Sequence, residues 1–296
     1  MNKRSLGYGI GTYELEAPRL ALAAPAEVCD QLRATFSSAA YSPPVLPAVA
    51  IELMQLSQQP DVSFAQIRRV MEKDALIAAS VLRVAQSTAY SAAGAVRTLD
   101  DALVRLGLKT VGCFFLEAAM KLKVFRAPGY EAPMKALTDH SAACAHLARH
   151  LARRTSLFDE YAFMCGLLHD IGIAAGLIAL SAGTKKEHVP SLAEVWPAVR
   201  DAHEMASETV CRAWALTPEI ALVAGNHHAC RVGGHIHPVA AVVALADFIA
   251  GELGCGLDEG SLVPNDAVLS VLGLTPRELP ALIVECKPVV AASMSA

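Results

Sequence analysis

The sequence predicts an all-α protein on three observations. Alanine and leucine dominate the 296 residues, and aromatic residues make up only 5%, a composition that favours helices over strands. Apolar residues recur at helical spacing, and neither a strand-like alternation nor an internal repeat is found. Hydrophobic residues make up 54% of the chain, enough for one large core or two small ones. We therefore expect a helical bundle, which the breaks described below divide into two lobes.

The first lobe is predicted over residues 41–127, behind a partly ordered leader of residues 1–40. Prolines make the entry to this lobe extended, because each biases its predecessor away from helix. Two capping boxes start helices: Ser63 with Gln66, and Thr98 with Asp101. Gly107 is a C-terminal stop. The helices of this lobe are expected over residues 48–57, from residue 63 onward, and over residues 75–85, 99–106 and 109–125.

Pro128-Gly129 and Pro133 mark a break, and the second lobe is predicted over residues 128–296. Its helices are longer and more apolar, and they are expected over residues 134–155, 160–182, 199–215, 218–228 and 238–253. Thr217-Pro218 is an N-cap followed by proline at the first helical position. Thr275–Glu278 repeats this device near the C-terminal helices.

Charge and cysteine content restrict the classes of partner. The net charge of −4 gives no electrostatic support for nucleic-acid binding. The first lobe has short helices joined by tight turns, so a DNA-binding regulator stays a minor alternative, although no helix concentrates Arg, Lys, Asn or Gln. The eight cysteines form no Cys-x-x-Cys pair, and several lie in apolar helical stretches, where free cysteine behaves as a small hydrophobe. No uncharged apolar run reaches about 18 residues. We expect a cytoplasmic protein that does not bind membranes.

The adjacent His169 and Asp170, inside an apolar run, form the most informative stretch of the sequence. Burying both side chains costs several kcal/mol unless something compensates them. A metal ion binds a neutral imidazole and an ionised carboxylate together. The alternative is a core histidine beside an aspartate that caps a helix through backbone hydrogen bonds.

Other predicted helices carry similar side chains. Together with His169-Asp170, five successive helices present residues that bind metals, and the additional ones are His140, His203, His227, His228 and Asp247. Helix bundles build metal sites from side chains that converge on the core. Each residue alone also has a structural explanation, such as a surface position or a charge satisfied by a neighbour. His146 and His150 are spaced four apart, but three arginines surround them, and we interpret this pair as solvent-facing.

The order of these residues resembles the metal-ligand series of the HD phosphohydrolase superfamily. The first lobe is similar to the HDOD group of bacterial signalling domains, and the second lobe continues the similarity over about residues 41–253. The segments that carry it are Leu46-Pro47, Glu72–Tyr90, Thr98–Gly107, Gly166–Gly172 and Trp214–Ile220.

This resemblance implies an all-helical module of two lobes with an HD-like C-terminal lobe, used mainly in regulation or as a scaffold. The chain departs from the family pattern at Ala75, where proline is usual, and at Gln86, where asparagine is usual. It also lacks the Gly-Tyr-Pro segment that the cyclic-di-GMP-hydrolysing branch carries after its paired histidines. Ala136 stands where some of that branch have a carboxylate.

Two main functions follow from the resemblance. The first is a regulatory signal-transduction protein that has an HD-type metal site and acts on other signalling proteins. The second is a metal-dependent phosphohydrolase that acts on a nucleotide or another phosphoester. Its mechanism would use Asp170 as a bridge between two ions, with His140, His169 and Asp247 on one ion and His203, His227 and His228 on the other.

A phosphohydrolase needs cationic groups near the metals to bind its substrate. The sequence offers no recognisable phosphate clamp, and its nearest candidates are Lys185, Lys186, Arg200 and Arg231. Nitrogen and oxygen ligands suit one or two divalent ions of Fe, Mn, Ni or Zn.

Overall fold

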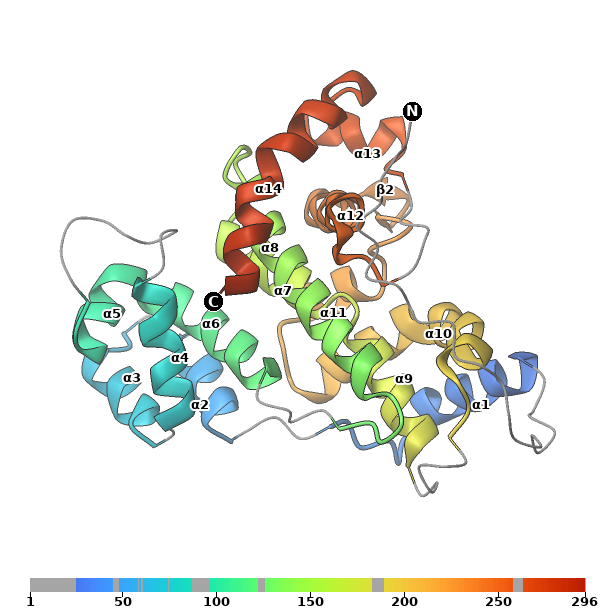
Figure 1. Cartoon of the computed structure of the whole chain (residues 1–296), viewed down its shortest axis with the longest axis horizontal. Helices are drawn as coiled ribbons and strands as arrows, with labels where there is room; N and C mark the ends of the chain where they lie inside the picture. The colour runs from blue at the N-terminus through green and yellow to red at the C-terminus, as the bar shows by residue number, and fades with distance from the viewer. Residues whose placement is uncertain are drawn as a thin grey trace.

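The computed structural model is all-α, as the sequence predicts, apart from one short two-stranded hairpin. Its helices form a smaller N-terminal lobe and a larger C-terminal lobe (Figure 1). The structure describes residues 25–44, 48–57, 59, 61–73, 75–86, 96–121, 126–182, 189–257 and 263–295. Lys185, Lys186 and parts of the first-lobe motifs, among them Pro47 and Asp74, lie outside these ranges.

The described helices of the N-terminal lobe are α2 (Ala48–Ser57), α3 (Phe64–Met71), α4 (Ala75–Gln86), α5 (Leu99–Leu106) and α6 (Leu108–Lys121). Both predicted capping boxes are present. Ser63 and Gln66 start α3, and Thr98 and Asp101 start α5. Gly107 follows α5 with φ of 77°, a backbone conformation that favours glycine.

The C-terminal lobe contains α7 (Glu131–Ala152), α8 (Asp159–Leu168), α9 (Ile171–Ser181), α10 (Leu192–Ala213), α11 (Pro218–Ala224), α12 (Pro238–Ala250), α13 (Asp266–Val271) and α14 (Leu279–Ser295). Shorter elements are β1 (Arg231–Val232), β2 (His235–Ile236), the π-helical turn η3 (Gly251–Cys255) and the 3-10 turn η4 (Pro276–Glu278). Helix α7 packs against α8, α12 and α14, and α9 packs against α10.

Helix α1 (Pro25–Ser37), which lies in the predicted leader, packs along α10 at the right of Figure 1. Val28, Leu32 and Phe36 are buried on one side of α1, at the i, i+4, i+8 spacing of an amphipathic helix. The Arg33 guanidinium also pairs with the Asp201 carboxylate of α10. This part of the leader therefore contributes to the core of the C-terminal lobe.

Two helix predictions are wrong in a way that matters for the site. The single helix expected over residues 160–182 is broken into α8 and α9 at His169-Asp170, where Asp170 has φ of −105° and ψ of 15°. The helix expected over residues 218–228 ends at Ala224, so the paired histidines lie in the turn that follows. In both places the predicted metal-binding residues, His169-Asp170 and His227-His228, lie at a turn and not within a continuous helix.

Two further boundaries differ from the prediction. Helix α10 begins at Leu192 and not after Pro197, because the Glu194 carboxylate accepts the Ser191 backbone N–H at 2.9 Å and fixes an earlier start. The hairpin between α11 and α12 was not predicted, because two residues per strand are too few to show an alternating pattern.

The prediction that His146 faces solvent is wrong. The His146 Nε2 lies 3.3 Å from the Glu117 Oε2 of α6. One turn further along α7, the Arg149 guanidinium carbon lies 4.1 Å from the ring centroid of Phe163 and 4.9 Å from that of Phe114. Glu117 and Arg149 are both buried. These five side chains form the lobe junction, where α7 and α8 of the C-terminal lobe meet α6 of the N-terminal lobe.

Residues 159–181 and 238–255 are long and apolar enough to cross a membrane, but 78% and 56% of the residues in their apolar 18-residue windows are buried within the protein. Most of the first stretch packs between other helices, including α7 and α10. Packing in the helical core accounts for the hydropathy of both stretches.

Candidate metal centre

The structure brings all seven predicted metal-binding residues to one place in the C-terminal lobe. The residues are His140 of α7, His169 and Asp170 of the α8–α9 turn, His203 of α10, His227 and His228 of the turn after α11, and Asp247 of α12. All the histidines except His228, together with Asp170, are buried. Five separate segments thus converge on a single buried cluster.

Two glycines allow the α8–α9 turn to reach this place. A Cβ atom on Gly166 would lie 2.7 Å from the Cys144 carbonyl oxygen of α7. A Cβ atom on Gly172 would lie 2.1 Å from the His203 carbonyl oxygen of α10. The Gly172 N–H also donates to the Ser207 Oγ at 2.8 Å. Without these close approaches, the turn could not sit between α7 and α10.

Asp170 lies at the centre of the cluster, and its two carboxylate oxygens face different halves. Its Oδ2 lies 3.3 Å from the His169 Nε2 and 3.5 Å from the His140 Nε2. Its Oδ1 lies 3.4 Å from the Nε2 atoms of both His203 and His227. A carboxylate in this position can bridge two cations that are held by the two pairs of imidazoles.

The remaining two residues complete the two halves. The Asp247 Oδ1 lies 3.4 Å from the His140 Nε2, on the side of Asp170 Oδ2. The His228 Nε2 lies 3.1 Å from the His203 Nε2, on the side of Asp170 Oδ1. The first half therefore contains His140, His169 and Asp247, and the second half contains the other three histidines.

Backbone carbonyls fix the tautomers of four histidines. The Nδ1 of His140 donates to the Cys255 carbonyl at 2.8 Å, and the Nδ1 of His169 donates to the Gly166 carbonyl at 2.8 Å. The Nδ1 atoms of His203 and His227 donate to the carbonyls three residues before them. A carbonyl can only accept, so each Nδ1 carries the proton and each neutral ring presents its Nε2 lone pair to the cluster.

This donor set fits divalent metal ions. The Nε2 atoms of His140 and His169 are 3.3 Å apart, as are those of His203 and His227. In the neutral tautomers these paired atoms present lone pairs to each other, which is unfavourable unless a cation or a proton lies between them. Carbonyls that orient imidazole ligands through Nδ1 are the usual outer partners of protein metal sites.

The protonation states favoured at Asp170 and His227 suit a metal, whereas an ion would have to displace a proton from His169. Burial opposes the charge on Asp170, but the imidazoles of His169 and His140 outweigh it and hold the pKa of this carboxyl well below its ordinary value. Burial lowers the pKa of His227 to about 3. For His169, burial acts in the same direction, but the Asp170 charge outweighs it and the pKa is raised. The bridging carboxylate is thus ionised and His227 is neutral at neutral pH, the forms that bind metals.

Of the predicted substrate-binding residues, the structure describes Arg200 and Arg231, and the contacts found for them involve the backbone. The Arg231 guanidinium is exposed and donates to the Gly234 carbonyl at 2.9 Å within its own hairpin. Arg200 is also exposed and contributes its carbonyl to the His203 Nδ1. An acidic side chain, Glu204, instead lies close to the second half, where it accepts the His228 backbone N–H at 3.0 Å.

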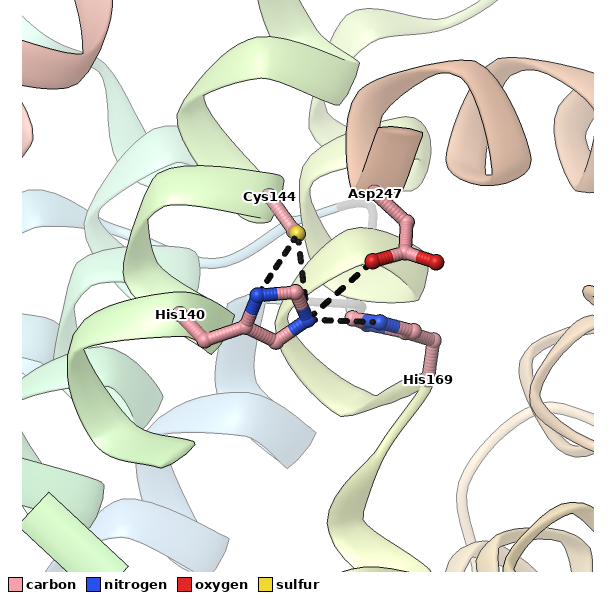
Figure 2. Close-up of side chains that lie close together, drawn as sticks. All are labelled: His140, Cys144, His169 and Asp247. Carbon is pink, nitrogen blue, oxygen red and sulfur yellow. Dashed lines mark hydrogen bonds and ion pairs between the residues drawn. The ribbon is translucent and has the colours of Figure 1, made fainter. Parts of the chain in front are cut away.

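One side chain of the first half was not predicted. Cys144 lies one turn after His140 on α7, and its Sγ is 3.5 Å from the His140 Nε2 (Figure 2). Its ligand atom lies within 4.8 Å of those of His140, His169 and Asp247. The i, i+4 spacing to His140 indicates it, but a free cysteine in an apolar helical stretch is also expected as a small hydrophobe.

The comparisons with known proteins agree with this architecture. A crystal structure of a proposed metal-dependent phosphohydrolase from Shewanella amazonensis SB2B has a TM-score of 0.69 at 21% identity, covering 91% of this chain and 98% of that one. An HDOD domain protein of unknown function from Geobacter sulfurreducens has a TM-score of 0.65 at 22% identity, covering 90% and 99%. A proposed signal-transduction protein from Marinobacter aquaeolei VT8 has a TM-score of 0.67 at 21% identity, covering 92% and 65%.

At these identities the three structures show a shared fold. No curated protein sequence matches the chain. The family model of the HDOD domain matches residues 44–230, which include the N-terminal lobe and most of the metal-binding cluster. The chain therefore belongs to the HDOD domain family.

Proposed function

We propose that this chain is a signal-transduction protein that holds one or two divalent metal ions at the Asp170 cluster and acts by binding other signalling proteins in the cytoplasm. One observation carries the metal-binding part. The two oxygens of Asp170 each face two imidazole Nε2 atoms, at 3.3–3.5 Å. These separations suit an ion placed between the donor atoms, because metal–ligand bonds of about 2.0–2.2 Å hold neighbouring ligands roughly this far apart.

The regulatory part rests on two helices that link the cluster to the lobe junction. Helix α7 carries His140 at the cluster and Arg149 at the junction. Helix α8 carries Phe163 at the junction and ends next to His169. A change in either helix on metal binding reaches both sites through packed side chains, a contiguous physical route for coupling. Metal occupancy would thereby bias the arrangement of the two lobes that a partner protein contacts.

The placement in the cytoplasm rests on the thiols. All eight cysteines are free, and six of them are buried. Unpaired cysteines in this number are typical of a reducing compartment.

A metal-dependent phosphohydrolase is the second candidate, and the bridging position of Asp170 favours it. A pair of bound divalent ions would supply Lewis-acid chemistry for phosphoester hydrolysis. In this chain Asp170 and the oriented imidazoles would hold the ions. A substrate phosphate also needs cationic partners, and Arg231, one of the two described candidates, donates to a carbonyl of its own hairpin. This is why we place regulation first.

The two candidates differ in what metal loading does. We would load the protein with manganese or zinc and compare the wild type with Asp170→Ala. The assays are hydrolysis of bis(p-nitrophenyl) phosphate and amide hydrogen exchange in α6. The regulatory proposal predicts metal-dependent protection of α6 and no hydrolysis above that of the variant. Hydrolysis that requires Asp170 would establish the enzyme instead.

A further inference from the structure

Two of the three imidazoles of the second half lie in a turn that helix geometry does not hold. Helix α11 ends at Ala224, so His227 and His228 belong to the turn of residues 225–229, here called the paired-histidine turn. The His203 Nε2 of α10 nevertheless lies 3.3 Å from the His227 Nε2 and 3.1 Å from the His228 Nε2. Contacts from outside α11 must therefore fix this turn relative to α10.

Cys230 fixes the end of the paired-histidine turn. Its backbone N–H donates to the Asn226 carbonyl at 2.8 Å, and its carbonyl accepts the His237 N–H at 2.8 Å. The Cys230 Sγ also lies 3.0 Å from the His227 carbonyl oxygen. Cys230 has φ of 54°, a conformation uncommon for residues other than glycine. These contacts join the turn to itself and to the start of α12, and a link to α10 is needed besides.

Glu204 of α10 provides that link. Its Oε1 accepts the His228 backbone N–H at 3.0 Å, and the same oxygen lies 3.7 Å from the His227 Nδ1. His203 is the preceding residue, so one place on α10 supports all three imidazoles. The Glu204 oxygen lies on the Nδ1 side of His227, whereas the Nε2 faces Asp170. Glu204 is therefore an outer partner of the ligands, and it is not among the described groups that could hold a metal.

We propose that Glu204 is a positioning residue of the second half. Its hydrogen bond to the His228 N–H holds the paired-histidine turn at the distance from α10 at which the three imidazoles bind one ion. The inference rests on the metal site of the proposed function and deepens it. Removing an outer partner of metal ligands typically weakens metal binding about 10–100-fold. We expect this loss in Glu204→Ala, confined to the ion of the second half.

Glu204→Gln separates the hydrogen bond from the charge. The glutamine amide keeps an oxygen acceptor on a side chain of the same length but carries no negative charge. If Glu204 acts by accepting the His228 N–H, Glu204→Gln should bind the second ion about as tightly as the wild type. If the charge alone supports the ion, Glu204→Gln should be as weak as Glu204→Ala, and the positioning role would be wrong.

Glu208 is a matched control one turn further along α10. Its side chain is 34% exposed, close to the 29% of Glu204, and its carboxylate pairs with the Arg212 guanidinium of the same helix. It also packs beside Gly225 at the start of the paired-histidine turn. Glu208→Ala therefore removes the same atoms and some packing near the turn, but takes no described hydrogen bond from it.

Zinc binding tests the proposal in the full chain. We would titrate zinc against a chelator of known affinity and compare the wild type with Glu204→Ala, Glu204→Gln and Glu208→Ala. His228→Ala identifies the binding step of the second half, because it removes a ligand from that half alone. The proposal predicts that this step is weakened about 10–100-fold in Glu204→Ala and unchanged in the other two variants.

Amide hydrogen exchange tests the bond itself in the metal-free protein. The His228 amide should exchange faster in Glu204→Ala than in the wild type, Glu204→Gln and Glu208→Ala. Equal exchange in all four proteins, or an unchanged second binding step in Glu204→Ala, would overturn the positioning role and leave the metal site of the proposed function standing. If no ion binds even in the wild type, the proposed metal site fails and the inference fails with it.

Discussion

The close approach of α9 to α10 makes Gly172 the position most sensitive to one added methyl group. In Gly172→Ala the new Cβ would lie 2.1 Å from the His203 carbonyl oxygen and 2.6 Å from the Ser207 nitrogen, whereas ordinary contact begins at 3.4 Å. Relief therefore requires the two helices to separate by about 1.3 Å at this point. Forcing an extra carbon into a packed core costs about 1–3 kcal/mol.

The separation should also disturb metal binding, because α10 carries His203. The His203 Nε2 lies 3.4 Å from the Asp170 Oδ1, and protein metal sites tolerate deviations of only about 0.2 Å in ligand distance. We expect Gly172→Ala to be less stable than the wild type by about 1–3 kcal/mol without metal, and to lose the ion of the second half.

Gly176 provides the matched control on the same helix. A Cβ atom there would meet its nearest neighbour, the Val199 Cγ1, at 3.6 Å, an ordinary contact distance. Alanine favours helix over glycine by about 1 kcal/mol, so Gly176→Ala should be as stable as the wild type or slightly more stable. The assays are urea unfolding of the metal-free proteins and metal per chain after loading. If the two variants unfold alike and bind the same number of ions, the close approach does not position His203.

Three further predictions concern pH, the lobe junction and α1. Burial lowers the pKa of His227 to about 3, so the contribution of this neutral imidazole to the free energy of unfolding is complete above pH 6.5 and is lost as the pH falls from 6.5 towards 3. Between pH 7 and pH 5, the free energy of unfolding of the metal-free wild type in urea should fall by about 2 kcal/mol more than that of His227→Gln. Equal losses in the two proteins would refute this. Arg149→Met removes a buried cation from the Phe163 ring and should lower the free energy of unfolding by about 2 kcal/mol. An unchanged thermal unfolding midpoint would contradict this. Leu32→Ala should lower the free energy of unfolding by about 2–5 kcal/mol, because Leu32 is buried in the core that α1 shares with α10. A loss below about 0.5 kcal/mol, which is typical of surface substitutions, would mean that α1 is only loosely attached.

The composition and the caps were sufficient to predict the class of fold and several helix boundaries. Ser63 with Gln66 and Thr98 with Asp101 form the capping boxes that the sequence indicates, because a capping box is a local device that needs no tertiary contact. The break at Asp170 could not be predicted in this way. It depends on the approach of α9 to α10, which only tertiary packing provides.

The seven predicted metal-binding residues were identified by residue type and order, and the structure brings them together. Their role as ligands stays a prediction. Cys144 and the largely covered position of His146 were missed for the same reason: each depends on which helix faces it. The arginine next to His146 in space, Arg149, suggested a solvated face, yet its charge lies over two aromatic rings at the lobe junction. A cation–π contact of this kind leaves no simple periodicity in the sequence.

The central claim is that Asp170 bridges two metal positions, and metal content tests it most directly. We would measure transition metals per chain in the purified and metal-loaded wild type, in Asp170→Ala, and in a control, Asp266→Ala, which removes an exposed carboxylate at the start of α13. The account predicts about two ions per chain in the wild type and the control, as expected for a two-metal site, and a loss of metal in Asp170→Ala. A wild type that binds no ion after loading, or an Asp170→Ala variant that retains both ions, would contradict it.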